Sequence, residues 1–310
     1  MKRFYFFLML ITSTTLLTLS GCKKDNTNAE IDLTSDVTIQ SDDHAMFSAE
    51  DDAVSDDVNL AVASESAFGG KAAKTSSVIC DATVTRDSTP LTRSLVITYN
   101  GSTTCNGTHT RTGVVTLTMD KNIRWKNVGA VLTVNIQNLK ITRTRDAKSL
   151  TFNGTKTIKN ATGHLLTELA SFSPIIHLIN SSNMSATFDN GTIRQWQIAK
   201  QRKFNYNNGI VISLTGTGGT GSDVAVWGTN RLGQEFSTRI VEPLVVRQDC
   251  SFRLVSGKVE HTKIARPIMV TFGLDASGNA TACPGAGAYY YYKAEWTSQL
   301  GVVHSIIKPY

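Results

Sequence analysis

SLVITYNGSTTCNGTHTRTGVVTLTM, residues 94–119, carries the pattern that decides the fold. Apolar side chains alternate with polar ones through SLVITYN at 94–100 and again through GVVTLTM at 113–119. A period of two places successive side chains on opposite faces of a β-strand, and Val, Ile and Thr favour that conformation. The segment between the two runs is polar and rich in Gly and Thr. The stretch therefore predicts two neighbouring strands joined by a loop.

The same pattern continues along the chain from about Thr75. Further runs of this kind are AVLTVNI (130–136), VISLT (211–215) and MVTFG (269–273). Turn signals separate such runs: Asp189-Asn190-Gly191, Asn207-Asn208-Gly209, Ser256-Gly257 and Ser277-Gly278. No stretch of twelve residues has helical periodicity, although HLLTEL at 164–169 can form a helical turn or two. Strands without intervening helices predict an all-β antiparallel meander over 75–310, with a sandwich, a barrel and an extended sheet all left open.

The N-terminus resembles a bacterial lipoprotein signal. Lys2 and Arg3 supply positive charge, and residues 4–19 form an apolar stretch diluted by Thr and Ser. A membrane-spanning helix needs about 20 mostly apolar residues, so this stretch is typical of a signal peptide over 1–21. Leu-Ser-Gly-Cys, ending at Cys22, resembles the lipobox, in which the cysteine is acylated. We expect Cys22 to carry the lipid that attaches the protein to a membrane; ordinary signal cleavage beside an incidental cysteine is the alternative.

The composition changes sharply behind this signal. Residues 25–65 contain twelve Asp and Glu and no Lys or Arg, whereas residues 71–310 contain 27 Lys and Arg against 13 Asp and Glu, a formal charge of 27 − 13 = +14. Acidic segments poor in aromatic residues are typically disordered. We therefore expect residues 22–74 to form a mostly disordered acidic tether, with a short helix over 44–63. Such a helix would bring these residues near one face: Met46, Phe47, Val54, Val58 and Ala61.

Four further cysteines follow Cys22, and disulfides would fit an oxidising compartment. Residues 80–105 and 250–283 each begin and end with Cys, and each runs through a polar hairpin and an apolar strand to a closing Cys-x-Gly. This similarity indicates a weak internal duplication. Four cysteines allow three pairings, and the duplication favours Cys80–Cys105 and Cys250–Cys283. A zinc site is the alternative, but the sequence has no Cys-x-x-Cys and no His pair near these cysteines.

Several segments between these cysteines resemble a group of uncharacterised lipoproteins of Bacteroidota. The segments are CNGTHTRTGVVTLT (105–118), FNGTKTIKN (152–160), WGTNRLGQEFST (227–238), VEPLVVRQDC (241–250) and LVSGKV (254–259). The resemblance implies attachment to the outer membrane, and Lys23, Lys24 and Asp25 are similar to a signal for display at the cell surface. It implies no activity, so no catalytic residue is carried over. Asp87-Ser88-Thr89 also matches the short O-glycosylation pattern of these bacteria.

The sequence gives little support for an enzyme. The six histidines, at 44, 109, 164, 177, 261 and 304, are scattered and have no metal-ligand spacing. There is no Gly-x-Ser-x-Gly elbow, and TGTGGTGS at 215–222 has no following Lys, which favours a hairpin tip over a phosphate loop. Carboxylate catalysis by two facing acids remains an alternative, and its candidates include Asp189, Glu235, Glu242 and Glu295. We expect no catalytic residues, no cofactor and no metal.

One predicted strand offers a candidate binding face. TIRQWQIAKQRKFNY, residues 192–206, places cations and aromatic rings on one parity: Arg194, Trp196, Ile198, Lys200, Arg202, Phe204 and Tyr206. Guanidinium groups pair with carboxylates or phosphates while rings stack on sugars, so an exposed face of this kind would bind an acidic glycan or lipopolysaccharide. The alternative is that the aromatic and aliphatic members face the core. The basic charge could equally attract the chain's own acidic tether.

These features together predict an outer-membrane lipoprotein, anchored at Cys22, that presents a basic all-β domain for binding or scaffolding. Its domain would face either the cell surface or the periplasm. Its partners would be the membrane and an acidic glycan or lipopolysaccharide, and no nucleic acid is expected at such a place. The alternatives are an envelope-associated hydrolase and a purely structural envelope protein.

Overall fold

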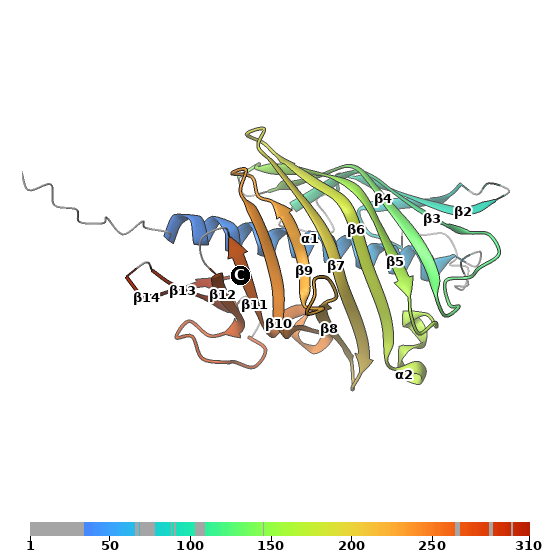
Figure 1. Cartoon of the computed structure of the whole chain (residues 1–310). Helices are drawn as coiled ribbons and strands as arrows, with labels where there is room; N and C mark the ends of the chain where they lie inside the picture. The colour runs from blue at the N-terminus through green and yellow to red at the C-terminus, as the bar shows by residue number, and fades with distance from the viewer. Residues whose placement is uncertain are drawn as a thin grey trace, which may run out of the picture. The chain divides into compact units, whose positions relative to one another are not determined.

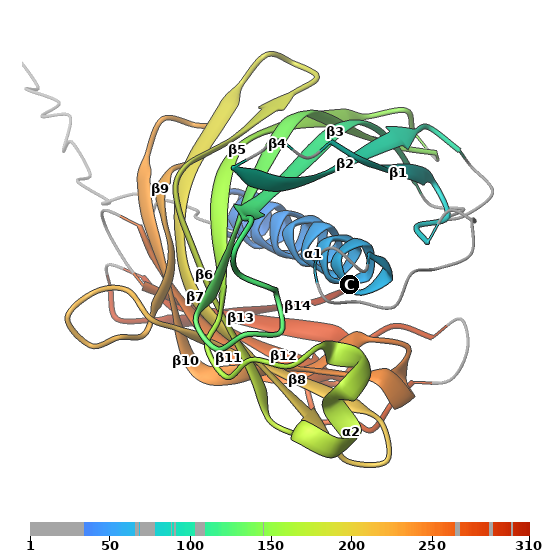
Figure 2. The same cartoon turned by 90° about the vertical axis from the view of Figure 1, so that its right-hand side faces the viewer.

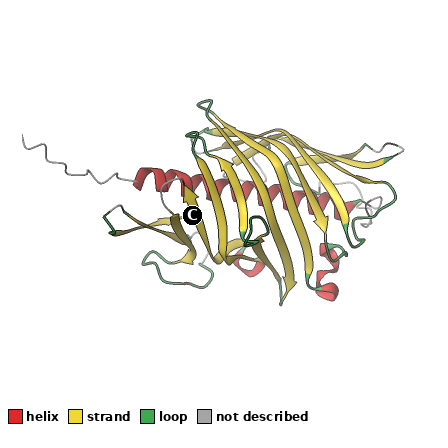
Figure 3. Cartoon of the chain, viewed as in Figure 1, coloured by secondary structure: helices red, strands yellow, loops and turns green. Residues whose placement is uncertain are grey.

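Fourteen antiparallel strands form one sheet in the computed structural model, which describes residues 34–310 except 66–67, 69–77, 88, 90, 103–108, 145, 264–266, 285–287 and 299. The strands are β1 (Ala82–Arg86), β2 (Thr92–Asn100), β3 (His109–Asp120), β4 (Ala130–Arg143), β5 (Ser149–Asn160), β6 (Ile175–Phe188), β7 (Ile193–Tyr206), β8 (Ile210–Gly216), β9 (Val224–Thr229), β10 (Glu235–Arg247), β11 (Arg253–Lys263), β12 (Pro267–Leu274), β13 (Tyr291–Thr297) and β14 (Val303–Pro309). The described residues belong to one compact unit, Asp32–Tyr310. The predicted all-β meander is confirmed, and it consists of a single sheet whose outer strands are β1 and β14 (Figure 3).

The order of the strands follows the chain except at one position. Both β8 and β9 lie between β7 and β10: β8 pairs with the C-terminal halves of these long strands and β9 with their N-terminal halves. Residues 217–223 connect β8 to β9 and leave the sheet there. Gly218 and Val224 form an antiparallel bridge across this segment, so TGTGGTGS turns the chain back at a loop tip as predicted, although β8 and β9 on either side of it run in the same direction.

Glycines bend the long strands. A Cβ atom at Gly228 would lie 2.1 Å from the carbonyl oxygen of Gln195 on β7, and one at Gly113 would lie 2.4 Å from that of Asn138 on β4. Gly154 and Gly257 face a neighbouring backbone in the same way. The register also shifts beside Gly113 and Gly154, which is typical of β-bulges. All four glycines therefore lie where two neighbouring strands approach each other closely.

A long helix, α1 (Thr34–Ser64), lies against one face of the curved sheet. Figure 2 looks along α1 and shows β2–β5 above it, β6 and β7 beside it and β12–β14 below it. Phe47, Val54, Val58 and Ala61, which the sequence places on one helical face, are 0–4% exposed and belong to the main apolar core. Residues 34–64 thus differ from the expected mostly disordered tether, and the helix expected over 44–63 is longer and packed.

Two apolar clusters stabilise this arrangement. The first joins α1 to β1–β7, and the second lies among β7–β14 together with α2 (Leu169–Phe172). A short 3-10 helix, η2 (Leu166–Glu168), precedes α2, so the predicted helical turn at 164–169 is confirmed. None of the helices among the described residues is long and apolar enough to cross a membrane. The predicted signal peptide and Cys22 lie outside the described residues.

The predicted disulfide Cys250–Cys283 is present and closes the hairpin β11–β12, beginning at η3 (Gln248–Cys250). Cys80 is also disulfide-bonded. Its predicted partner Cys105 lies outside the described residues, so that pairing stays a prediction. Each cysteine-bounded segment nevertheless holds one hairpin, β1–β2 in the first and β11–β12 in the second. The two hairpins occupy different places, because β1 is an outer strand whereas β11 and β12 lie inside the sheet, so the internal duplication stays a prediction.

Candidate functional site

The strand predicted to carry the binding face is β7, and its alternating faces differ strongly in burial. Arg194, Trp196, Lys200, Arg202 and Phe204 are only 1–6% exposed and lie on the face that is turned toward the core. Ile198, on the same face, is buried as well, and Tyr206 at the end of the strand is 49% exposed. The expectation of an open cation–aromatic surface is therefore not met. The alternative prediction, that these residues face the core, is correct for β7 from Arg194 to Phe204.

The acids of α1 neutralise the cations of this buried face. Lys200 binds two of them, with its Nζ 2.8 Å from Oδ2 of Asp51 and 3.1 Å from Oδ1 of Asp52. Lys156 on β5 binds the other oxygen of Asp51 at 2.5 Å and also donates to the hydroxyl of Ser55 at 2.9 Å. Burial alone would raise the pKa of Asp51, but Lys156 and Lys200 together hold it below its usual range. The acidic segment and the basic strands are thus parts of one buried ionic cluster.

Two arginines extend this cluster along α1. Arg202 donates to Asp56 at 3.0 Å. Arg111 on β3 forms a fork with Asp81, at 2.7 and 2.6 Å, and also donates to Asp57 at 2.7 Å. The bidentate pair holds the Arg111 guanidinium group against Asp81, which precedes β1, and the third bond of Arg111, to Asp57, links α1 to β3.

Arg194 has a different environment from the other cations of β7. Its guanidinium carbon lies 4.6 Å from the ring centre of Phe47 on α1 and 4.2 Å from that of Phe236 on β10. The ring of Phe47 also packs against that of Trp196, at 5.3 Å between centroids. Cation–π contacts of this kind stabilise a desolvated guanidinium group. These aromatic rings therefore serve the contact between α1 and the sheet.

Buried ionisable groups beside α1 have strongly shifted pKa values. Burial raises the pKa of Glu50 to about 7, with Asp57 and Asp81 adding to the effect and Arg111 opposing it. Burial lowers the pKa of His177 to about 3, and the ring lies between Trp125 and Phe204. Burial and the charge of Arg194 lower the pKa of His261 to about 3. Both histidines are therefore neutral core residues at pH 7.

An exposed basic loop lies elsewhere, between β3 and β4. It contains Lys121, Arg124 and Lys126, all exposed, and we call residues 121–129 the basic loop. Arg93 on β2 donates to the carbonyl of Ile123 in this loop. Lys159 is exposed on β5, and the carbonyl of the following residue accepts a hydrogen bond from the amide of Gly129 at 2.7 Å. Five cations thus lie in or beside one loop. The cations of the buried face, in contrast, are paired with the acids of α1.

A polar hollow of about 340 Å³ opens on the face of the sheet that points away from α1. It is lined by Ser182, Asn183, Met184, Ser185, Gln195, Trp196, Gln197, Gly228 and Thr229. The bulge in β6 and the kink at Gly228 create the space. Its volume is at the lower end of the range for small-molecule sites. The polar side chains that line the hollow are uncharged amides and hydroxyls, so they can hydrogen-bond an uncharged, hydroxyl-rich ligand.

The residues considered for catalysis are dispersed. Glu242 and Glu295 form exposed or half-exposed ion pairs with Lys258 and Lys293, at 2.7 and 3.0 Å. Asp189 is exposed at a turn and Glu235 is exposed at the start of β10, and neither they nor Glu242 and Glu295 line the polar hollow. Asp57 and Asp81 are one pair of carboxylates that does converge, and their distant sequence positions did not reveal it. Arg111 binds both of them, so they stabilise the fold in this arrangement.

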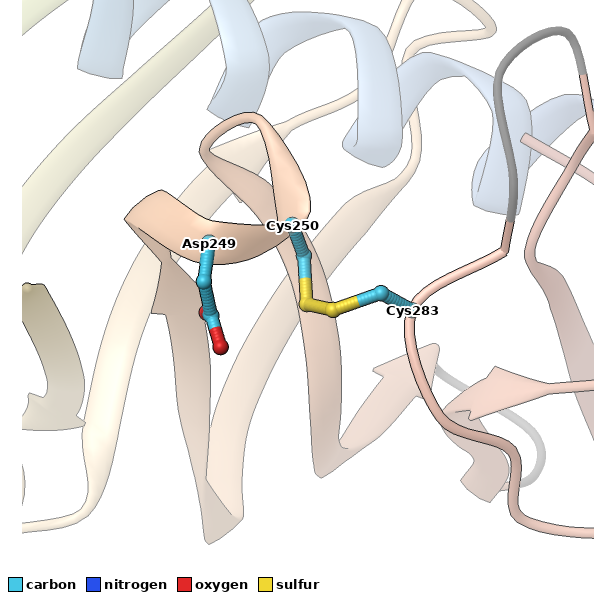
Figure 4. A group of neighbouring side chains, drawn as sticks. All are labelled: Asp249, Cys250 and Cys283. Carbon is cyan, nitrogen blue, oxygen red and sulfur yellow. A yellow bond between two sulfur atoms is a disulfide. The ribbon is translucent and has the colours of Figure 1, made fainter.

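One group of potential metal ligands is explained by the disulfide. Ligand atoms of Asp249, Cys250 and Cys283 lie within 4.8 Å of one another. Figure 4 shows the two sulfurs bonded to each other and the Asp249 carboxylate beside them. Oxidised sulfurs are not thiolate ligands, and Asp249 is already paired with Arg247. This group therefore gives no support for a metal centre.

Comparisons with known proteins add no identification: no protein-family model, curated protein or solved structure matches this chain. The resemblance to Bacteroidota lipoproteins consequently rests on the quoted segments alone.

Proposed function

We propose that this protein is a lipid-anchored component of the bacterial cell envelope, attached to the outer membrane at Cys22, whose β domain binds acidic polysaccharide or lipopolysaccharide. The observation that carries the binding proposal is the exposed basic loop. Lys121, Arg124 and Lys126 of this loop are all exposed, Arg93 donates to the carbonyl of Ile123 in the loop, and Lys159 is exposed on β5. Exposed lysine and arginine side chains attract polyanions, and a lipid-anchored envelope protein meets acidic glycans and headgroups.

This proposal relocates the ligand from the strand predicted by the sequence. Asp51 and Asp52 hold Lys200, and Asp56 holds Arg202. An acidic glycan would have to displace carboxylates that are covalently part of the chain and therefore present at high effective concentration. Among the described contacts, no carboxylate of α1 binds a cation of the basic loop. This supports the basic loop as the binding site.

The binding proposal is tested with polygalacturonate on the full-length protein. Lys121→Gln, Arg124→Gln and Lys126→Gln together should weaken binding by about tenfold or more, if each cation contributes roughly 0.5 kcal/mol. Binding of the unaltered protein should fall steeply with added salt, and uncharged dextran should not bind. The matched control replaces three other exposed lysines, Lys140, Lys148 and Lys308, by Gln. Equal losses in both triple variants, or no binding at low salt, would favour the purely structural alternative.

The anchor is tested separately. Cys22→Ser should abolish lipidation and leave an unprocessed precursor or a soluble protein. Retention of this variant on membranes after washing with high salt would contradict the lipid anchor. Protease treatment of intact cells would then distinguish display at the surface from a domain that faces the periplasm.

The polar hollow supports a second candidate, a site for an uncharged sugar. Trp227 on β9 opposes Gln197 on β7, on the outer face of the sheet beside this hollow. A ring next to amide side chains is a suitable surface for a pyranose. Titration with maltohexaose tests this candidate, and Gln195→Ala with Gln197→Ala should remove any binding. Binding that survives this double substitution would place the sugar elsewhere.

A further inference from the structure

We propose that the turn between β13 and β14 contacts the lipid bilayer that holds the anchor, and so orients the β domain on the membrane. This inference rests on the proposed lipid anchor. Three exposed aliphatic side chains lie at this turn: Leu300 is 65% exposed, Val302 50% and Val303, the first residue of β14, 68%. Single exposed apolar residues are ordinary, but three at one turn form a patch of the kind that binds proteins or membranes.

The turn has the chemistry of a segment that enters a lipid interface. Residues 296–305, WTSQLGVVHS, contain no Lys, Arg, Asp or Glu. The backbone of the turn is hydrogen-bonded internally: the amide of Ser298 donates to Val302 at 2.8 Å and that of Gly301 to Ser298 at 3.1 Å. Polar backbone groups that are already paired cost less to move toward the acyl chains. The patch can therefore approach the lipids without losing backbone hydrogen bonds.

The turn is also held firmly by the strands behind it. β13 and β14 pair without interruption from Tyr291↔Pro309 to Thr297↔Val303. The ring of His304 stacks on that of Trp296, at 5.5 Å and 16°. Trp296 in turn pairs with Ile268 on β12 and is 6% exposed. The apolar tip is consequently a rigid projection of the sheet.

The position of the turn identifies its partner. Figure 1 shows the turn between β13 and β14 at the same end of the domain as the beginning of α1. Residues 23–33 separate Cys22 from α1, and a fully extended chain of this length spans at most about 40 Å. Buried ion pairs hold α1 against β5 and β7, so α1 stays attached to the sheet that carries the turn. A bilayer that holds Cys22 therefore lies within reach of the turn.

The experiment uses the full-length lipidated protein in vesicles of phosphatidylcholine and phosphatidylethanolamine with brominated acyl chains. Leu300→Trp should add fluorescence that the brominated lipids quench, because bromine quenches tryptophan at close contact. The matched control is Leu91→Trp at the turn before β2, where an equally apolar residue is 81% exposed. Its added fluorescence should not be quenched. Amide hydrogen exchange supplies a second measurement on unaltered sequence: residues 300–303 should exchange more slowly in the vesicle-bound protein than in soluble Cys22→Ser protein.

The outcomes separate this inference from the proposed anchor. Failure of the protein to float with the vesicles would contradict lipidation at Cys22, and the bilayer contact would fall with it. Flotation with unquenched Leu300→Trp fluorescence and unchanged exchange at 300–303 would overturn the contact of the turn alone. Equal quenching of Leu300→Trp and Leu91→Trp would also overturn it, because the domain would then have no preferred orientation.

Discussion

Lys156 on β5 and Asp51 on α1 are 105 residues apart in the chain, yet their charged groups lie 2.5 Å apart and their side chains are 0% and 6% exposed. Asp51 also binds Lys200 from β7 with its second oxygen. One helix carboxylate therefore links two strands that are not neighbours in the sheet, since β6 lies between them. Buried charges are tolerated only when they are paired, so this contact determines where α1 lies.

Removing this carboxylate should strongly destabilise the protein. Asp51→Asn leaves Lys156 without its carboxylate and Lys200 with Asp52 alone, and the expected loss in unfolding free energy is about 3–5 kcal/mol. The control is Asp146→Asn, which removes an exposed ion pair with Arg143 and should cost about 0–1 kcal/mol. Urea denaturation measures both. A loss below about 1 kcal/mol for Asp51→Asn would contradict a buried ionic cluster. Asp51→Leu combined with Lys156→Met should recover part of the loss, because both buried charges are then absent.

The bend at Gly228 should not tolerate a side chain. Gly228→Ala places a methyl group against the carbonyl of Gln195, and we expect a loss of more than about 2 kcal/mol or failure to fold. Gly191→Ala is the matched control, because it also has positive φ but its Cβ would meet nothing within 4 Å. The control should cost only about 1–2 kcal/mol for the left-handed backbone. Similar thermal stabilities of the two variants would show that contact between strands at Gly228 is not limiting.

Glu50 should make stability depend on pH. Its pKa in the folded protein, about 7, lies above the ordinary 4.5, so its protonated form stabilises the fold. This contribution is fully present below about pH 4.5 and is lost as the pH rises through 7. Glu50→Gln removes the ionisation, and its stability relative to the unaltered protein should rise by about 3 kcal/mol between pH 4.5 and pH 8. Denaturation curves at the two pH values measure this difference. A constant difference for Glu50→Gln would mean that Glu50 has an ordinary pKa.

The two disulfides should be local. Peptide mapping without reduction is expected to give Cys80 linked to Cys105 and Cys250 linked to Cys283, without free thiols at these four positions. Replacing Cys250 and Cys283 by Ala together should cost about 3–4 kcal/mol in the chain-entropy model, for a sequence separation of 33. A peptide joining Cys80 to either C-terminal cysteine would contradict both the structure and the internal duplication.

The strands were predictable because their pattern is local. TIRQWQIAKQRKFNY predicts a strand over 192–206, and β7 runs from Ile193 to Tyr206. Which of its faces is buried could not be read from alternation, because Arg194, Lys200 and Arg202 share a parity with Trp196 and Phe204. Cations normally indicate a solvent face. Their burial depends on acids from α1, and sequence separations of about 146 to 149 residues give no local signal of that pairing.

The candidate sites depend on geometry that the sequence patterns do not contain. The polar hollow exists because β6 bulges at Ser182 and Asn183 while β9 bends at Gly228. Gly228 is visible in the sequence, but a lone Gly in a strand does not reveal which neighbouring strand it approaches. The basic loop was visible as Lys121, Arg124 and Lys126 within six residues. The sequence pattern favours β7 instead, because that strand has both cations and aromatic rings on one parity.

The placement of α1 has a consequence for the order in which the protein assembles. The ribosome makes this helix before any strand, but its partners Lys156, Lys200 and Arg202 follow about 100 to 150 residues later. Contacts between such distant residues form slowly. Until they form, Lys156, Lys200 and Arg202 lack the carboxylates that neutralise them in the folded domain. The acids of α1 are therefore a part of the folded β domain and not a separate acidic segment.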